Sequence, residues 1–254
     1  MKERDLILII DFGSQYTQLI TRRVREVNVY SEIHPHSISL EEVQILKPKG
    51  IILSGGPMSV YDDSAPSIDT RIFNLKIPLL GLCYGLQLIC KNFGGTVEPA
   101  ANREYGKSVL RVTDNSDILN GVEDASIVWM SHGDYLSELP KGFKVVGESD
   151  YSPICAISNQ SRKIYGLQFH PEVVHTEKGE KIIKNFLFDI CKCKGDWTSQ
   201  NFIEEQLKNI KTTVGSSKAI CALSGGVDST VAAILVKKAI GDNLICIHID
   251  NGLM

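Results

Sequence analysis

The chain has 254 residues, of which 43% are hydrophobic and 22% charged, and its formal net charge at pH 7 is -3. This length accommodates one sizeable domain and part or all of a second, and the charge gives no reason to expect a nucleic-acid surface. The apolar runs are of strand length, whereas a membrane helix needs roughly 18 apolar residues, so we expect no membrane partner. Seven cysteines, an odd number scattered through apolar segments, favour a reducing, cytoplasmic setting over a disulfide framework.

The first part of the chain alternates predicted strands with predicted helices. Residues 6–11, LILIID, form a continuous apolar run typical of a buried parallel strand. Residues 14–27 carry apolar side chains at helical spacing, with Ser14 as the expected N-cap. Further strands at 50–57 and 77–83 each enter a glycine turn. This alternation predicts an α/β fold, a sheet with helices on both faces.

After residue 95 the pattern changes to short strands joined by turns, which we expect to be antiparallel additions to the sheet. The last of these strands is KIYGLQFHPE, residues 163–172, and an amphipathic helix over 177–191 follows it. The polar segment KCKGDW then predicts a boundary between a first domain, residues 1–194, and a second, residues 195–254.

The segment GLCYGLQ places a cysteine on the turn between a strand and a helix. The G-x-C-x-G form is the cysteine counterpart of a nucleophile elbow, in which small flanking residues permit a sharply bent backbone. The helix that begins near Tyr84 directs unpaired N–H groups and the positive end of its dipole at the sulfur, which favours the thiolate. Cys83 is therefore predicted to be a nucleophile, although a free cysteine taken alone is more often a small buried apolar residue.

The segment LQFHPE offers a base for this cysteine. Because residues i and i+2 of an extended segment project to the same side, we expect Glu172 to orient His170 while the other ring nitrogen faces Cys83. The three residues form a predicted catalytic triad. Attack on a carbonyl also requires an oxyanion hole, for which we predict the backbone N–H groups of Tyr84 and of Gly56 in the turn LSGGP.

GLCYGLQ, LSGGP and GLQFHPE together resemble the class I, triad-type glutamine amidotransferases, over about residues 5–193. The resemblance implies a flavodoxin-like mixed sheet with helices on both faces. It also implies that Cys83 attacks the side-chain amide of glutamine, forms a glutamyl thioester and releases ammonia, without a cofactor. His170 would protonate the leaving ammonia and later activate water. By the same pattern the glutamine would be held by Gln87 and the segment 129–134, with its α-amino group at Asp134 and part of its main chain at Ser131 or His132.

A second motif, LSGGVDST at residues 223–230, follows an apolar strand and opens a helix. It lacks the Walker A pattern, but its glycines let backbone N–H groups approach an anion and the helix start adds its dipole. The motif resembles the pyrophosphate loop of the ATP pyrophosphatases, and a strand over 244–254 is expected to follow the helix. The residues implied to bind ATP or pyrophosphate are Ser224, Gly225, Gly226, Val227, Asp228 and Ser229, with Asp228 as the candidate Mg²⁺ ligand.

The combination of the two parts is similar to the GMP synthetase family of glutamine-hydrolysing ligases. That resemblance implies glutamine, ATP and xanthosine monophosphate (XMP) as substrates, with ammonia from the glutaminase site aminating XMP, and a homodimer only for the full-length protein. The second part holds one helix and one βαβ unit, and two parallel strands cannot bury a core of their own. We therefore expect this chain to be truncated and to retain only the glutaminase part.

Two other functions remain open from the residues alone. A stand-alone cysteine hydrolase of the same fold is disfavoured by Gln87 and by the nucleotide loop. A non-catalytic sensor of glutamine or nucleotide is disfavoured by the triad, because a binding module has no need of a base beside a thiol.

Overall fold

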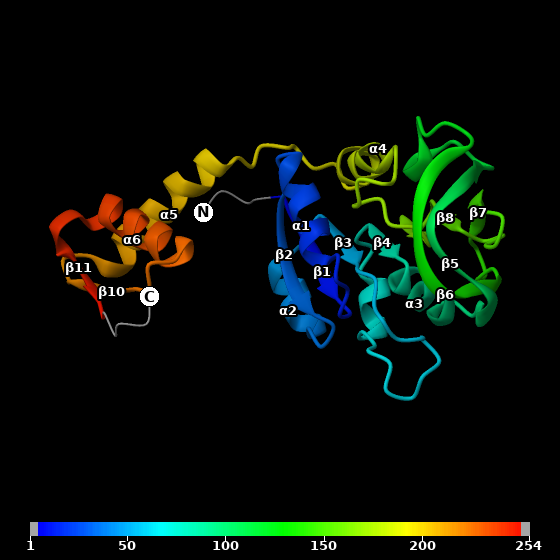
Figure 1. Cartoon of the computed structure of the whole chain (residues 1–254), viewed down its shortest axis with the longest axis horizontal. Coiled ribbons are helices and arrows are strands. Elements are labelled where there is room, and N and C mark those ends of the chain that lie inside the picture. The colour runs from blue at the N-terminus through cyan, green and yellow to red at the C-terminus, as the bar shows by residue number, and fades with distance from the viewer. Residues whose placement is uncertain (1–4, 250–254) are drawn as a thin grey trace. The chain divides into compact units, whose positions relative to one another are not determined.

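The computed structural model describes residues 5–249, and the chain divides into two compact units, Met1–Asp196 and Trp197–Met254. Figure 1 shows the strands and helices of each unit. Within the described residues no helix is long and apolar enough to cross a membrane.

The first unit is built on one large mixed sheet, which has nine strands within the described residues, in the order β2-β1-β3-β4-β9-β8-β7-β5-β6. The strands from β2 to β9 in this order pair in parallel, and those from β9 to β6 pair antiparallel. Their bounds are β1 Leu6–Asp11, β2 Tyr30–Pro35, β3 Gly50–Leu53, β4 Leu79–Leu82, β5 Thr96–Val112, β6 Ser126–Glu138, β7 Lys144–Glu148, β8 Ala156–Asn159 and β9 Ile164–Leu167.

Helices cover both faces of the parallel half of this sheet. In β1, Ile7 and Ile9 pack in one apolar cluster, which includes residues of α1, while Leu8 and Ile10 pack in another, which includes residues of α2 and α3. The continuous apolar sequence of this strand follows from burial on both sides. The bounds are α1 Thr17–Glu26, α2 Leu40–Leu46, η1 Thr70–Asn74, α3 Tyr84–Asn92, η2 Asp117–Leu119, α4 Gly179–Lys184 and the π-helical η3 Asn185–Ile190.

The predicted α/β class and sheet with helices on both faces are confirmed, with three corrections. The segment that contains β9 was expected to be an antiparallel addition, but β9 pairs in parallel with β4, with Leu167 opposite Leu82. All four residues of β9 are buried, so this short strand belongs to the doubly covered part of the sheet. Ser14 is not the cap of the first helix, which begins at Thr17 after Tyr16. The helix predicted over 177–191 is α-helical only to Lys184 and then π-helical.

The second unit contains α5 Ser199–Val214, β10 Ala219–Leu223, α6 Val227–Ile240, η4 Gly241–Asn243 and β11 Leu244–His248. Strands β10 and β11 pair in parallel. Many apolar side chains of this unit are exposed, including Ile220 at 70% and Val227 at 78%, and Ala233 is the one buried apolar residue among those described, because two strands and two helices offer little surface for burial. The predicted strand 244–254 extends to His248, and its residues 250–254 lie outside the described part of the chain.

Candidate active site

Cys83 occupies the turn between β4 and α3, at the carboxyl ends of β3, β4 and β9. Its backbone has φ 51° and ψ -104°, a conformation that a residue with a side chain seldom adopts. The neighbouring strands hold it there, since the Cys83 N–H donates to Leu167 O at 2.7 Å and the Gly85 N–H donates to Ser54 O at 3.1 Å. Strained backbone at the carboxyl edge of a parallel sheet is typical of a functional site.

The glycines of the G-x-C-x-G pattern have a steric purpose in this turn. A Cβ on Gly81 would come within 2.5 Å of the Gly85 backbone, and a Cβ on Gly85 would come within 2.5 Å of Leu53 O. Strand β4, strand β3 and helix α3 can therefore approach closely only because both positions lack side chains. This close approach produces the sharp turn that presents Cys83.

His170 and Glu172 form a buried pair beside Cys83. The Nδ1 atom of His170 lies 2.7 Å from Oε1 of Glu172, and both side chains are almost fully buried. The pair does not arise from an extended segment, as the sequence argument assumed: β9 ends at Leu167, and residues 171–172 lie in a turn. Thr176 Oγ1 donates to His170 O at 2.6 Å and stabilises this turn.

The electrostatic surroundings favour a protonated His170. Burial alone lowers the pKa of this imidazole, but the Glu172 carboxylate and the neighbouring Cys83 sulfur raise its pKa well above the ordinary value. The sulfur has two further polar neighbours, with Gln168 Nε2 donating to Sγ at 3.6 Å and Ser131 O at the same distance from Sγ. Tyr16 packs edge-on against the imidazole, with 5.0 Å between ring centroids. An imidazolium next to a sulfur is the arrangement that stabilises a thiolate nucleophile.

The LSGGP turn, which follows β3, lies directly against this pair. A Cβ on Gly55 would lie 3.3 Å from His170 Cε1 and 3.7 Å from Cys83 Cβ, and a Cβ on Gly56 would approach Phe12 O to 2.9 Å. The turn thus brings its backbone close to the sulfur because both residues are glycines. Gly56 and Tyr84, the predicted oxyanion donors, both line the cavity next to Cys83.

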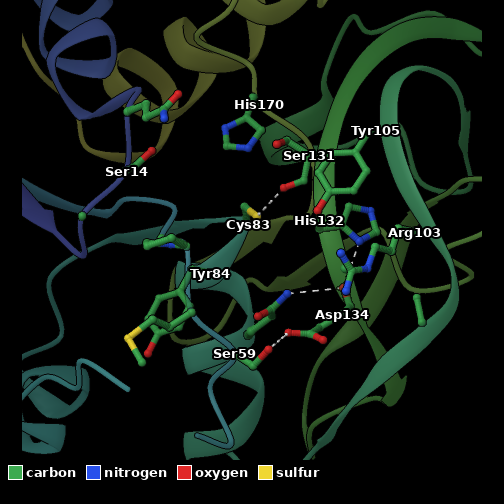
Figure 2. Close-up of a pocket in the computed structure, with 18 of the residues that line it drawn as sticks. Ser14, Ser59, Cys83, Tyr84, Arg103, Tyr105, Ser131, His132, Asp134 and His170 are labelled. Atoms are coloured by element: carbon green, nitrogen blue, oxygen red, sulfur yellow. Dashed lines mark hydrogen bonds between the residues drawn. The ribbon is translucent and has the colours of Figure 1, made fainter. Parts of the chain in front are cut away.

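A cavity of about 720 Å³ opens over Cys83, and Figure 2 shows Cys83, His170, Ser131, His132 and Asp134 around it. Gln87, Ser131, His132 and Asp134, the residues predicted to hold glutamine, line the cavity wall, whereas Glu172 lies outside the cavity lining. Gln87 Nε2 donates to Asp134 O at 3.4 Å. Lining residues that the sequence did not point to include Ser59, Tyr61, Arg103 and Tyr105.

The side chain of His132 is engaged in a buried network. Its Nδ1 donates to Asp134 O at 2.9 Å, and its Nε2 lies 3.2 Å from Oε2 of Glu104. Glu104 also accepts hydrogen bonds from three serine hydroxyls, those of Ser108, Ser149 and Ser152. Burial raises the pKa of Glu104, but the bonds from His132 and the serines outweigh it, and the pKa lies below its ordinary value. No sequence motif marks Glu104, although it fixes the backbone of the predicted glutamine-binding segment through His132.

Replacing Glu104 with glutamine should therefore destabilise the first unit in a pH-dependent way. A carboxyl whose pKa is lowered by folding stabilises the folded state above its unfolded pKa, and this contribution is lost as the pH falls through the folded pKa. Urea denaturation should show a loss of about 1–3 kcal/mol in the free energy of unfolding at pH 7, and a smaller loss below pH 4. Glu98→Gln, an exposed position on the same strand, is the matched control. An equal loss at both pH values would refute the charge-based role.

The predicted nucleotide loop of the second unit lies at the start of α6. Gly226 is the N-cap residue and has no side-chain cap bond, and Gly225 has φ +83°. Ser229 Oγ lies 3.1 Å from Ser224 Oγ and accepts a bond from Ser224 N at 3.3 Å. Asp228 stands in the first turn of α6. The loop is exposed and places hydroxyls beside a helix N-terminus, an arrangement suited to anions.

Comparison with known proteins connects both units to described families. Residues 8–190 match the family model "Glutamine amidotransferase class-I", and residues 198–251 match the family model "NAD synthase". The chain is 53% identical over 253 residues to proteins named GMP synthase [glutamine-hydrolyzing] of Bacillus cytotoxicus and Bacillus anthracis, with 100% of this chain and 49% of each relative covered. The chain thus spans about half the length of these curated relatives.

Two solved structures are similar to the first unit. A putative GMP synthase subunit of Thermoplasma acidophilum is 32% identical with a TM-score of 0.69, covering 80% of this chain and 98% of that one. A glutamine amidotransferase of Thermotoga maritima, 20% identical, has a TM-score of 0.60, covers 74% of this chain and 99% of that one, and shows the shared fold.

Proposed function

This chain belongs to the class I glutamine amidotransferase family, and we propose that its first unit hydrolyses glutamine to glutamate and ammonia with Cys83 as nucleophile, His170 as acid and base, and Glu172 as orienter. One observation carries this proposal. Cys83 stands on a strained turn at an open cavity that His170 also lines, and the Nδ1 atom of this histidine lies 2.7 Å from a buried carboxylate. That constellation is recognised by geometry and by the role of each group.

In the proposed mechanism the Cys83 sulfur attacks the side-chain amide carbon of glutamine. The developing oxyanion accepts hydrogen bonds from the N–H groups of Gly56 and Tyr84. His170 gives its proton to the leaving ammonia, and the C–N bond breaks to leave a glutamyl thioester. The imidazole then takes a proton from water, whose oxygen attacks the thioester carbonyl; the C–S bond breaks, which releases glutamate and returns Cys83 as the thiolate beside the imidazolium. Throughout, Glu172 holds the ring and stabilises its charged form.

We assign the binding of the glutamine main chain to the residues on the cavity wall below Cys83. Asp134 offers a carboxylate for the α-ammonium, and Ser131 and His132 offer backbone groups of the same strand, β6. Gln87 on α3 donates to the backbone of Asp134 and supports this wall. Because the cavity lies next to the nucleophile, a bound glutamine would place its side-chain amide near the sulfur.

We further propose that the ammonia serves the ATP-dependent amination of XMP to GMP, the reaction implied by the name of the curated relatives. The loop with Ser224, Gly225 and Gly226 would hold the pyrophosphate of ATP at the start of α6, together with Val227 and Ser229. Mg²⁺ is commonly bound by one or two carboxylates plus substrate phosphates, and Asp228 fits that role. Within residues 5–249 no cluster of three or more acidic, histidine or cysteine side chains forms a separate metal site.

The test of the glutaminase proposal is labelling with a glutamine analogue that carries an electrophilic diazoketone in place of the amide. Mass spectrometry should find a single adduct, on Cys83, and excess glutamine should prevent it. Cys90, on helix α3, is the internal control for selective labelling. Burial raises the pKa of its thiol to about 12 and keeps it protonated. Absence of selective labelling would favour a sensor, and labelling that glutamine does not prevent would favour a different hydrolase.

A further inference from the structure

The cavity over Cys83 is lined by one acidic and one basic side chain besides its histidines. Among the described residues that line it, Asp134 is the one carboxylate and Arg103 the one arginine or lysine. Arg103 is exposed, and its guanidinium makes no ion pair or hydrogen bond with any residue in 5–249. It packs against Gly133, where a Cβ would lie 3.6 Å from Arg103 Nε. Figure 2 shows Arg103 on the same side of the cavity as His132 and Asp134. An unpaired cation beside a carboxylate at a cavity wall suits a ligand that bears both charges.

The Asp134 carboxylate is held in place by two hydroxyl groups from one loop. Ser59 Oγ donates to Oδ2 at 2.5 Å, and Tyr61 OH donates to Oδ1 at 2.7 Å. These are the short distances of charge-assisted hydrogen bonds. A carboxylate has about four acceptor positions, so about two remain for a ligand. The two hydroxyls therefore fix the direction of the carboxylate without saturating it.

The loop that carries these hydroxyls is itself tied to the helix that follows Cys83. Lys91 Nζ donates to Val60 O at 2.6 Å, and Tyr84 OH donates to Pro66 O at 2.6 Å. The Val60 side chain, only 2% exposed, belongs to the apolar cluster on that face of the sheet. Since Tyr84 is the residue after the nucleophile, the position of the Asp134 carboxylate is coupled to the position of the sulfur.

We propose that Arg103 binds the α-carboxylate of glutamine, while Asp134, oriented by Ser59 and Tyr61, binds the α-ammonium. This inference rests on the proposed function, in which glutamine is the substrate at Cys83. It specifies the substrate class: the site accepts a free amino acid and discriminates against glutamine whose α-carboxylate is blocked. Because a guanidinium forms paired bonds with a planar carboxylate, Arg103 discriminates between glutamine and its α-amide.

The test is a binding experiment on the whole chain in a Cys83→Ala background, so that no ligand is consumed. Ligand-detected NMR, which measures millimolar Kd values, compares glutamine with glutamine α-amide. The parent should bind the amide about 10–100-fold more weakly, the equivalent of one lost charge-assisted bond. Arg103→Met should weaken the binding of glutamine by a similar factor and leave the affinity for the amide within about twofold of the parent value. Tyr61→Phe should weaken the binding of both ligands equally, by about five- to tenfold, because both ligands keep the ammonium that Asp134 binds.

Arg111→Met is the matched control, since Arg111 lies on the same strand, pairs with Asp150 and stands outside the cavity. It should change neither affinity. Equal binding of the two ligands by the parent, or an equal loss for both in Arg103→Met, would overturn the assignment of Arg103. If the parent fails to bind glutamine at all, the proposed function fails too, whereas glutamine-protected labelling of Cys83 with an unaffected Arg103→Met would contradict this inference alone.

Discussion

Replacing Cys83 with alanine should abolish glutamine hydrolysis and leave the fold nearly unchanged. Without the sulfur no thioester can form. Because the nucleophile and its base act as one unit, we expect kcat to fall by more than about 10⁴-fold. The hydrogen bonds of the sulfur to Gln168 and to Ser131 O are both long, at 3.6 Å, and alanine keeps the Cβ that the turn already accommodates. The measurement is glutamate release together with the thermal unfolding midpoint.

Cys90→Ala is the matched control for this variant. Cys90 lies on the helix that begins after Cys83, is fully buried, and should change stability but not turnover of the folded protein. Ammonia release by Cys83→Ala at a rate comparable to the parent would exclude Cys83 as the nucleophile. Loss of folding in Cys83→Ala would show that the thiol is chiefly a packing residue.

The parallel part of the fold was predictable because its strands are buried on both sides. The run from Leu6 to Asp11 has only one residue that is not fully buried, and such runs are apolar throughout. Strand β2 was missed because it lies at the sheet edge, where only Ser31 of its six residues is fully buried. Its sequence YSEIHP therefore lacks the apolar run. The direction of β9 depends on which strand it pairs with, and no local pattern encodes that choice.

In the candidate site, too, some residues were predictable from the sequence and others were not. Cys83 and its glycines were predictable, since the elbow is a local backbone requirement that a short motif records. The partners of Asp134 were not, because Ser59 and Tyr61 lie more than 70 residues away in the chain and carry no motif. Arg103 lies within the register shift of β5 between Pro99 and Glu104, and Glu104 is the residue at which pairing with β6 resumes. Pairing of distant segments is a tertiary property, so only the structure places these residues.

His170→Ala and Glu172→Gln should separate the base from its orienter. His170→Ala removes both the proton donor and the proton acceptor, and we expect a loss of about 10⁴-fold or more in kcat/KM. Glu172→Gln keeps an oxygen to accept from Nδ1 but removes the charge, so the expected loss is smaller, about 10²-fold. The measurement is glutamate release by each variant, with Glu177→Gln as a control that retains hydrogen-bonding capacity near the same turn. Equal and slight losses in both variants would mean that the H-P-E segment is structural.

The pH profile gives this comparison its sharpest readout. Burial of His170 lowers its pKa, and the Glu172 carboxylate raises it well above the ordinary value, so the parent should keep the imidazolium into alkaline solution. The Oε2 atom of Glu172 is buried and finds no hydrogen-bond partner in the described part of the chain, which leaves the imidazolium as the compensating charge. In Glu172→Gln this support is absent, the pKa of His170 falls, and the alkaline limb of kcat/KM should move to lower pH. An alkaline limb that stays in place would show that Glu172 holds the ring by shape alone.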